Sequence, residues 1–115
     1  MYKYLHMFTY NAELINVVDG DTIDVKIDLG FDIHINTRVR LLGIDTPEIR
    51  TKNLVEKTRG MEAKKFVENA FADNDNKCVV QTLKDKKGKY GRYLATIIVG
   101  GKSLNQMLID NNHEK

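Results

Sequence analysis

The 115-residue sequence has one cysteine, one proline, three histidines and no tryptophan. A single cysteine cannot form a disulfide within the chain, and the histidines are not spaced as metal ligands, so a disulfide scaffold and a structural zinc site are excluded. Cys78 opens an apolar run and is expected in the core. A chain of this length buries about two-thirds of its unfolded surface, so its apolar content suffices for a core. We predict one domain over residues 1–115.

Long apolar runs are also missing. No stretch approaches the length of a transmembrane helix, and the first ten residues lack the apolar centre of a signal peptide. We therefore expect no membrane partner, and a chain that acts either in the cytoplasm or as the mature form of a secreted protein. The net charge of +2 is too small to indicate a partner by itself. No obligate protein partner is evident, and we expect a monomer.

Alternating apolar residues predict strands in the first half of the chain. Residues 12–18 are densely apolar, and residues 22–29 alternate strictly between apolar and polar side chains. The Asp-Gly-Asp sequence at residues 19–21 separates these runs, and Asp-Gly favours a tight turn because it tolerates positive φ. A hairpin is therefore expected. After a second turn at Gly30, residues 33–44 are expected to form a long third strand.

The second half of the chain mixes helix and strand patterns. Residues 50–60 are polar, basic and aperiodic, which predicts a loop. Apolar residues then recur at helical spacing through residues 63–71, which predicts an amphipathic helix. Residues 78–83 and 93–99 are rich in strand-forming side chains. A capping box at residues 103–106 predicts a short C-terminal helix.

The predicted order is three strands, a helix, two strands and a helix. Short strands linked by hairpins argue against a parallel sheet and favour a small closed barrel. The OB-fold, a five-stranded Greek-key barrel, has the same number of strands and commonly carries a helix between the third and fourth strands. We therefore predict an α+β, mainly β domain: an OB-fold barrel with a helix between strands 3 and 4 and a short C-terminal helix.

Carboxylates occur where predicted strands begin or end. Asp21 lies in the first turn, and Asp45 and Glu48 follow the third strand. An Asp-Gly-Asp sequence is most often only a hairpin turn. Two Asp carboxylates and a backbone carbonyl are nevertheless a common ligand set for calcium or magnesium, and Pro47 favours an extended Thr46 whose carbonyl is available as a third ligand. Glu48 is near enough in sequence to orient or deprotonate a water beside the cation.

Two arginines are candidates for stabilising a phosphate. Hydrolysis of a phosphodiester requires positive charge on the phosphate oxygens, and arginine is preferred because its planar guanidinium binds two oxygens at once. Arg40 could otherwise only continue the solvent face of its strand, and the charged loop 84–91 could be a solvated hairpin tip. That loop carries Lys89 and Tyr90, and Arg92 follows it, so phosphate-attracting charge is combined with rings that stack on bases. The pattern favours DNA or RNA as substrate.

Three motifs, taken in order and spacing, resemble the thermonuclease family, which is typified by staphylococcal nuclease. They are Val18–Thr22, Val39–Glu48 and Lys89–Arg92. The similarity runs from about residue 12 to about residue 109, which is most of the chain. The resemblance implies an OB-fold domain. It also implies a calcium-dependent phosphodiesterase that cleaves DNA and RNA with little sequence preference and releases 3'-phosphorylated products.

The resemblance also implies a role for each acidic residue of the motifs. Asp21 and Asp45 resemble the calcium-binding carboxylates, and Thr46 would contribute its backbone carbonyl. Glu48 resembles the proposed general base. Asp19 fits a supporting place beside these ligands.

The basic and aromatic residues are assigned in the same way. Arg40 and Arg92 correspond to the two arginines that bind the phosphate and stabilise the transition state. Tyr90 resembles a hydrogen-bond donor to the substrate phosphate, and Lys89 beside it is expected to bind substrate.

Two features depart from the family pattern. Gly88 stands where the family has an Asp, and the chain stops at Lys115, before the family's last helix. An alternative is a non-catalytic OB-fold module that binds nucleic acid without cleaving it, because a fold does not fix a function. Such modules usually lose the carboxylates or arginines, which this chain retains, so the enzyme is favoured. A third possibility is a fragment too short to fold well.

Overall fold

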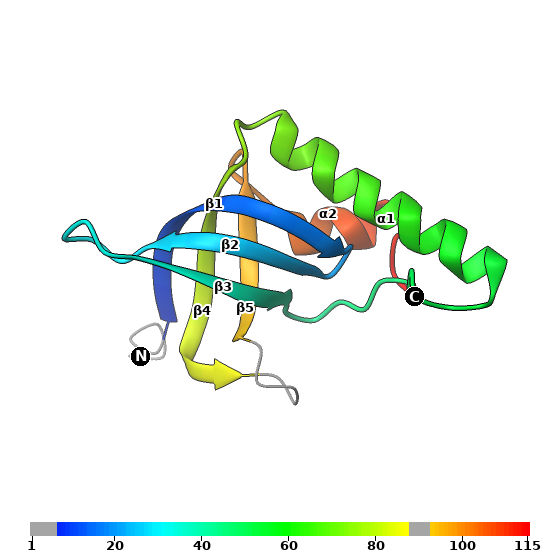
Figure 1. The fold of residues 1–115 in the computed structure, drawn as a ribbon, viewed down its shortest axis with the longest axis horizontal. Helices are drawn as coiled ribbons and strands as arrows, with labels where there is room; N and C mark the ends of the chain where they lie inside the picture. The colour runs from blue at the N-terminus through cyan, green and yellow to red at the C-terminus, as the bar shows by residue number, and fades with distance from the viewer. Residues whose placement is uncertain (1–6, 88–92) are drawn as a thin grey trace.

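The computed structural model describes residues 7–87 and 93–115, which form six strands and two helices (Figure 1). In chain order the elements are β1 (Met7–Asp19), β2 (Thr22–Asp28), β3 (His34–Leu41), α1 (Leu54–Ala72), β4 (Lys77–Lys87), β5 (Tyr93–Val99), β6 (Lys102–Ser103) and α2 (Leu104–Asp110). In this part of the chain, neither helix combines the length and the apolar character needed to cross a membrane.

The strands form one sheet in the order β3-β2-β1-β4-β5-β6, and a parallel pairing between β3 and β5 closes it. The other pairings are antiparallel. β1 pairs with both β2 and β4, since Ala12 pairs with Ile27 of β2 on one side and with Cys78 of β4 on the other. Two irregularities in its pairing with β2 let it bend around the barrel. The predicted five-stranded OB-fold is confirmed, with β6 as a two-residue addition.

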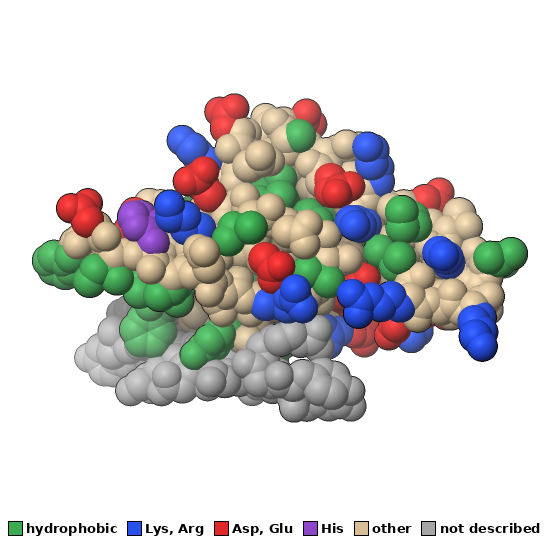
Figure 2. Space-filling view, viewed as in Figure 1, with side chains coloured by type: hydrophobic (Ala, Val, Ile, Leu, Met, Phe, Trp, Pro, Cys, Tyr) green, Lys and Arg blue, Asp and Glu red, His purple; other side chains and the backbone are tan. Residues whose placement is uncertain are grey.

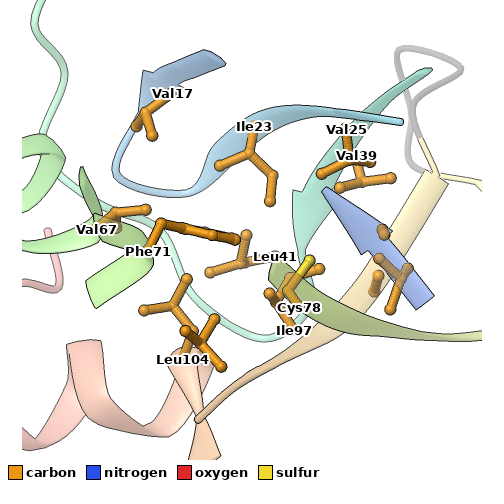
Figure 3. Close-up of a cluster of buried hydrophobic side chains, with 14 of the residues drawn as sticks. Val17, Ile23, Val25, Val39, Leu41, Val67, Phe71, Cys78, Ile97 and Leu104 are labelled. Carbon is orange, nitrogen blue, oxygen red and sulfur yellow. The ribbon is translucent and has the colours of Figure 1, made fainter. Parts of the chain in front are cut away.

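Both helices pack their apolar faces against the barrel and bury its core. Figure 3 shows Phe71 of α1 pointing into the barrel beside Val67 and Leu41, with Leu104 of α2 close by. All four side chains are fully buried. α1 contacts β1 and α2, whereas α2 contacts β5. This arrangement fixes α1 next to the segment that joins it to β3.

Cys78 belongs to this core, as predicted. Only 7% of the residue is exposed, and burial raises the pKa of its thiol to about 12. Because the thiolate is the reactive form of cysteine, this residue is not a nucleophile at neutral pH.

The prediction of a loop over residues 50–60 is wrong for its second half, because α1 begins at Leu54. The Asn53 side chain caps the helix by accepting hydrogen bonds from the amides of Val55 (3.0 Å) and Glu56 (3.1 Å). The apolar pattern missed this first turn because Leu54 and Val55 are exposed and form no buried stripe. The cap, rather than the periodicity, marks the start of the helix.

Other boundaries shifted by a few residues. β1 begins at Met7, five residues before its predicted start, because it pairs with β4 as well as β2. β3 ends at Leu41 instead of residue 44, since residues 42–43 form a turn. The predicted charged loop is wrong for residues 84–87, whose backbone continues β4. The predicted C-terminal helix and its Ser103 cap are confirmed, because the Ser103 hydroxyl accepts the Gln106 amide at 3.2 Å. The Gln106 side chain donates to Asp110 at 2.9 Å, so the reciprocal half of the predicted capping box is not formed.

Candidate functional site

The β1–β2 turn and the end of β3 lie side by side. Thr22 pairs with Arg40 across β2 and β3, and the Leu41 amide donates to the Asp21 carbonyl at 2.8 Å. In Figure 1 this turn lies next to the segment that leads from β3 to α1. Two stretches that are separate in sequence thus bring the candidate residues to one end of the barrel.

The Asp21 carboxylate is buried and held by several donors. Its Oδ1 accepts the Thr22 hydroxyl at 2.9 Å, and its Oδ2 accepts the Thr46 amide at 3.0 Å. Arg40 Nη2 lies 3.5 Å from the same Oδ2. These contacts fix the carboxylate and tie the segment after β3 to the β1–β2 turn.

Arg40 connects the two predicted calcium carboxylates. Its Nη2 forms ion pairs with Asp21 and Asp45 and donates to the Ile44 carbonyl at 3.4 Å. The Arg40 side chain is partly buried, whereas the Asp45 side chain is 70% exposed. A single cationic nitrogen therefore contacts both carboxylates, which places them around one point.

Asp19 and Glu48 extend this acidic group. Burial raises the pKa of the Asp19 carboxyl above its ordinary value of 3.8, and the charges of Asp21 and Glu48 raise it further. Arg50 and Lys64 act in the opposite direction without reversing the shift. The site therefore concentrates negative charge, which favours a bound cation and destabilises the fold when no cation is present.

Replacing Asp19 by Asn should stabilise the protein in the presence of a chelator. Because the folded pKa of Asp19 is raised, its contribution is favourable below the unfolded pKa and is lost as the pH rises through the folded value. At pH 7 the ionised carboxylate opposes folding, so we expect the Tm of D19N to rise by about 2 °C. The gain should shrink at about pH 3, below the ordinary value of 3.8, because the carboxyl is then mostly protonated in the unfolded protein as well as in the folded protein.

Thermal unfolding followed by circular dichroism at both pH values measures this effect. Glu13→Gln, which removes an exposed carboxylate from the same strand, is the control and should not change the Tm. A lower Tm of D19N at pH 7 would contradict the interpretation.

The oxygen atoms at the site fit a hard cation such as calcium. Asp21 and Asp45 supply carboxylates, and the buried Thr46 hydroxyl has no hydrogen-bond partner among the described residues. Within residues 7–87 and 93–115, no three His, Cys, Asp or Glu side chains are grouped closely enough to hold a metal ion by themselves. A metal here would therefore depend on backbone carbonyl, water or substrate oxygens as well.

Lys89, Tyr90 and Arg92 lie outside the described residues, so their predicted roles stay predictions. β5 begins at Tyr93, the next residue along the chain from Arg92. Tyr93 pairs with Val39, and Leu94 pairs with Arg40. The start of β5 thus lies alongside the part of β3 that carries Arg40.

An open cleft of about 610 Å³ adjoins Arg40 and Asp45. Leu94 and the C-terminal residues Glu114 and Lys115 also line it. The Lys115 amide donates to the Asp45 carbonyl at 2.7 Å, and Figure 1 shows the C-terminus beside the segment between β3 and α1. Figure 2 shows acidic and basic side chains intermixed on the face of the molecule that it draws. The cleft offers room for a charged ligand next to the carboxylates.

Sequence reasoning did not find Asn105, a buried polar residue of α2. Its Oδ1 accepts the Ile97 amide at 3.0 Å, and its Nδ2 donates to the carbonyls of Leu42 (2.8 Å) and Ala95 (3.2 Å). Asn105 therefore links α2 and β5 to the turn that precedes Asp45. The available signal was a polar residue adjacent to Leu104 on the apolar face of a predicted helix.

Comparisons with known proteins agree with this architecture. An SPbeta prophage-derived endonuclease of Bacillus subtilis is 38% identical over 100 residues, covering 86% of this chain and 31% of that protein. A thermonuclease of Staphylococcus hyicus is 32% identical over 96 residues, covering 84% of this chain and 53% of that protein. An uncharacterized protein of Methanocaldococcus jannaschii is 33% identical over 121 aligned residues, covering 91% of this chain and 55% of that protein.

The chain thus spans about half the length, or less, of these relatives. The family model described as Staphylococcal nuclease homologue matches residues 38–112. This range contains Arg40, Asp45, Thr46 and Glu48 and begins after the turn that holds Asp21. Because the match covers more than half of the chain, the chain belongs to the Staphylococcal nuclease homologue family.

Proposed function

We propose that this chain is a calcium-dependent nuclease domain that hydrolyses phosphodiester bonds of DNA or RNA with little sequence specificity. The observation that carries the proposal is the convergence of Asp21 and Asp45 on Arg40, next to an open cleft. Family membership supports it, since relatives include an endonuclease and a thermonuclease. The domain is proposed to act as a monomer.

Asp21 and Asp45 are the residues that would hold the calcium ion, together with the backbone carbonyl of Thr46. Bound there, calcium would supply positive charge that polarises the phosphate. Asp21 is well suited to this role because its hydrogen bonds to Thr22 and Thr46 orient the carboxylate before any ligand arrives. Asp45 is more exposed and faces the cleft.

Glu48 is proposed as the general base. Glu48 is exposed, so water reaches it. Its charge helps to raise the pKa of Asp19 within the same acidic group. As the water oxygen bonds to phosphorus, Glu48 accepts the water proton. The bond from phosphorus to the 5' oxygen of the next nucleotide breaks, and that oxygen leaves as a hydroxyl after it gains a proton from solvent. The product is a 3'-phosphate.

Arg40 and Arg92 are proposed to neutralise the charge that develops on the phosphate oxygens. Arg40 lies at the edge of the cleft, where its guanidinium can pair with a phosphate. Arg92 immediately precedes β5, which runs beside the Arg40 strand. Lys89 and Tyr90, which are close to Arg92 in the sequence, are proposed to bind the substrate backbone.

Cleavage of labelled single-stranded DNA and RNA, with calcium or with a chelator, tests the proposal. We expect products with calcium only, with a 3'-phosphate on one side of each broken bond and a 5'-hydroxyl on the other. The alternative is a module that binds nucleic acid without hydrolysis. It predicts retention on oligonucleotides that weakens with salt and no products under either condition.

A further inference from the structure

The first half of α1 lies directly against the segment that carries Glu48. Gly60 is buried there, and a Cβ at this position would lie 2.7 Å from the Pro47 carbonyl oxygen and 2.9 Å from the Glu48 carbonyl oxygen. Both neighbours are backbone atoms that no rotamer change can move. A glycine inside a helix costs about 1 kcal/mol relative to alanine, so its presence here indicates a need for close approach.

Glu56 precedes Gly60 by four residues and therefore lies on the same face of α1. Its Oε2 accepts the Glu48 amide at 3.2 Å, and the Lys115 ammonium lies 3.6 Å from the same oxygen. The Glu56 side chain is 27% exposed, which limits its freedom to turn elsewhere. Both the amide and the carbonyl of Glu48 are thus in contact with α1.

The same helix face also reaches the β1–β2 turn. A Cβ at Gly20 would lie 2.8 Å from the Cβ of Ala63 and 2.9 Å from Cγ2 of Thr46. Ala63, which follows Gly60 by three residues on α1, is fully buried. α1 therefore contacts the turn before Asp21 as well as the segment around Glu48, and it sets the spacing between them.

We propose that Glu56 and Gly60 are positioning residues, which fix the Glu48 backbone and so aim its carboxylate at the acidic group of Asp19 and Asp21. The inference rests on the proposed nuclease function for its catalytic consequence, whereas the contacts themselves do not depend on it. Glu56 acts through the Glu48 amide and not through the substrate. A displacement of about 1 Å at a reacting group can reduce a rate by about 10²-fold, so a loose Glu48 segment should be costly.

Glu56→Ala is the principal test variant, and Glu56→Gln is its conservative partner because an amide oxygen can still accept the Glu48 hydrogen bond. We expect E56A to lower kcat by about tenfold or more with KM changed less than about twofold, and E56Q to keep most of the activity. Glu62→Ala, which removes an exposed carboxylate from another face of α1, should be unaffected. Gly60→Ala should lower kcat in the same way as E56A.

Hydrogen exchange of the Glu48 amide, measured by NMR in the full chain, reads the contact without any activity assay. E56A should accelerate this exchange at least about tenfold, whereas E62A should leave it at the wild-type rate. If G60A fails to fold, the comparison of E56A with E56Q still tests the positioning role of Glu56. Unchanged exchange and unchanged kcat in E56A would overturn the positioning role. Absence of cleavage by the wild-type protein would instead overturn the proposed function and leave the exchange result standing.

Discussion

Replacing Glu48 by Gln should lower kcat by about 10²–10⁴-fold, the usual contribution of a general base. The amide keeps the shape of the side chain but cannot accept the water proton. Because the Glu48 side chain extends from an exposed position while its backbone is held by α1, the change should not disturb the fold. KM should change little, since the lost interaction belongs to the transition state.

Steady-state cleavage of a short labelled oligonucleotide in calcium measures this effect. Glu62→Gln is a matched control, because Glu62 is an exposed carboxylate outside the site. An unchanged Tm would show that the loss is chemical. If E48Q cleaves at more than about half the wild-type rate, another group must deprotonate the water.

Replacing Arg40 by Ala should lower kcat/KM by about 10²–10³-fold, as expected for removal of a preorganised donor to the transition state. The guanidinium lies next to both Asp21 and Asp45 at the edge of the cleft. Arg40→Lys should recover only part of this loss, because an ammonium cannot bind two phosphate oxygens in the same planar manner.

Arg38 offers a control on the same strand and the same face. It pairs with Asp24 at 2.8 Å instead of with Asp21 and Asp45, and its hydrogen bond holds the pKa of Asp24 below its ordinary range. Arg38→Ala should leave kcat/KM within about twofold and lower stability by less than about 1 kcal/mol, as for other exposed ion pairs. Equal losses in R38A and R40A would indicate a general charge effect and contradict the assigned role of Arg40.

The sequence predicted the barrel because its strands carry strong local signals. The strict alternation in residues 22–29 and the Asp-Gly turn correspond to β2 and to the turn before it. The start of α1 was missed because Leu54 and Val55 are exposed, so no buried stripe marks the first turn. Helical periodicity reports burial, and this turn is not buried.

Some features of the candidate site could likewise be predicted from local sequence patterns, and others could not. The turn and strand-end positions of Asp21 and Asp45 could be read from local patterns, and the closed barrel brings them together. The contacts of Glu56 with Glu48 and of Asn105 with Leu42 join residues of different segments, each of which has its own sequence pattern. They depend on how the helices pack against the barrel, which no single-segment signal contains. Arg92 was predicted from its motif and lies outside the described residues.

The dependence of the cleavage rate on calcium concentration, measured for the wild-type chain and for Asp45→Asn, is the most direct test of the calcium site. We expect no cleavage in chelator, a rate that saturates as calcium rises, and a half-saturating concentration about tenfold higher or more in D45N, since one charged ligand is lost. Cleavage that persists in chelator would contradict the calcium requirement, and an identical calcium dependence in the two proteins would contradict the assignment of Asp45 as a carboxylate that holds the ion.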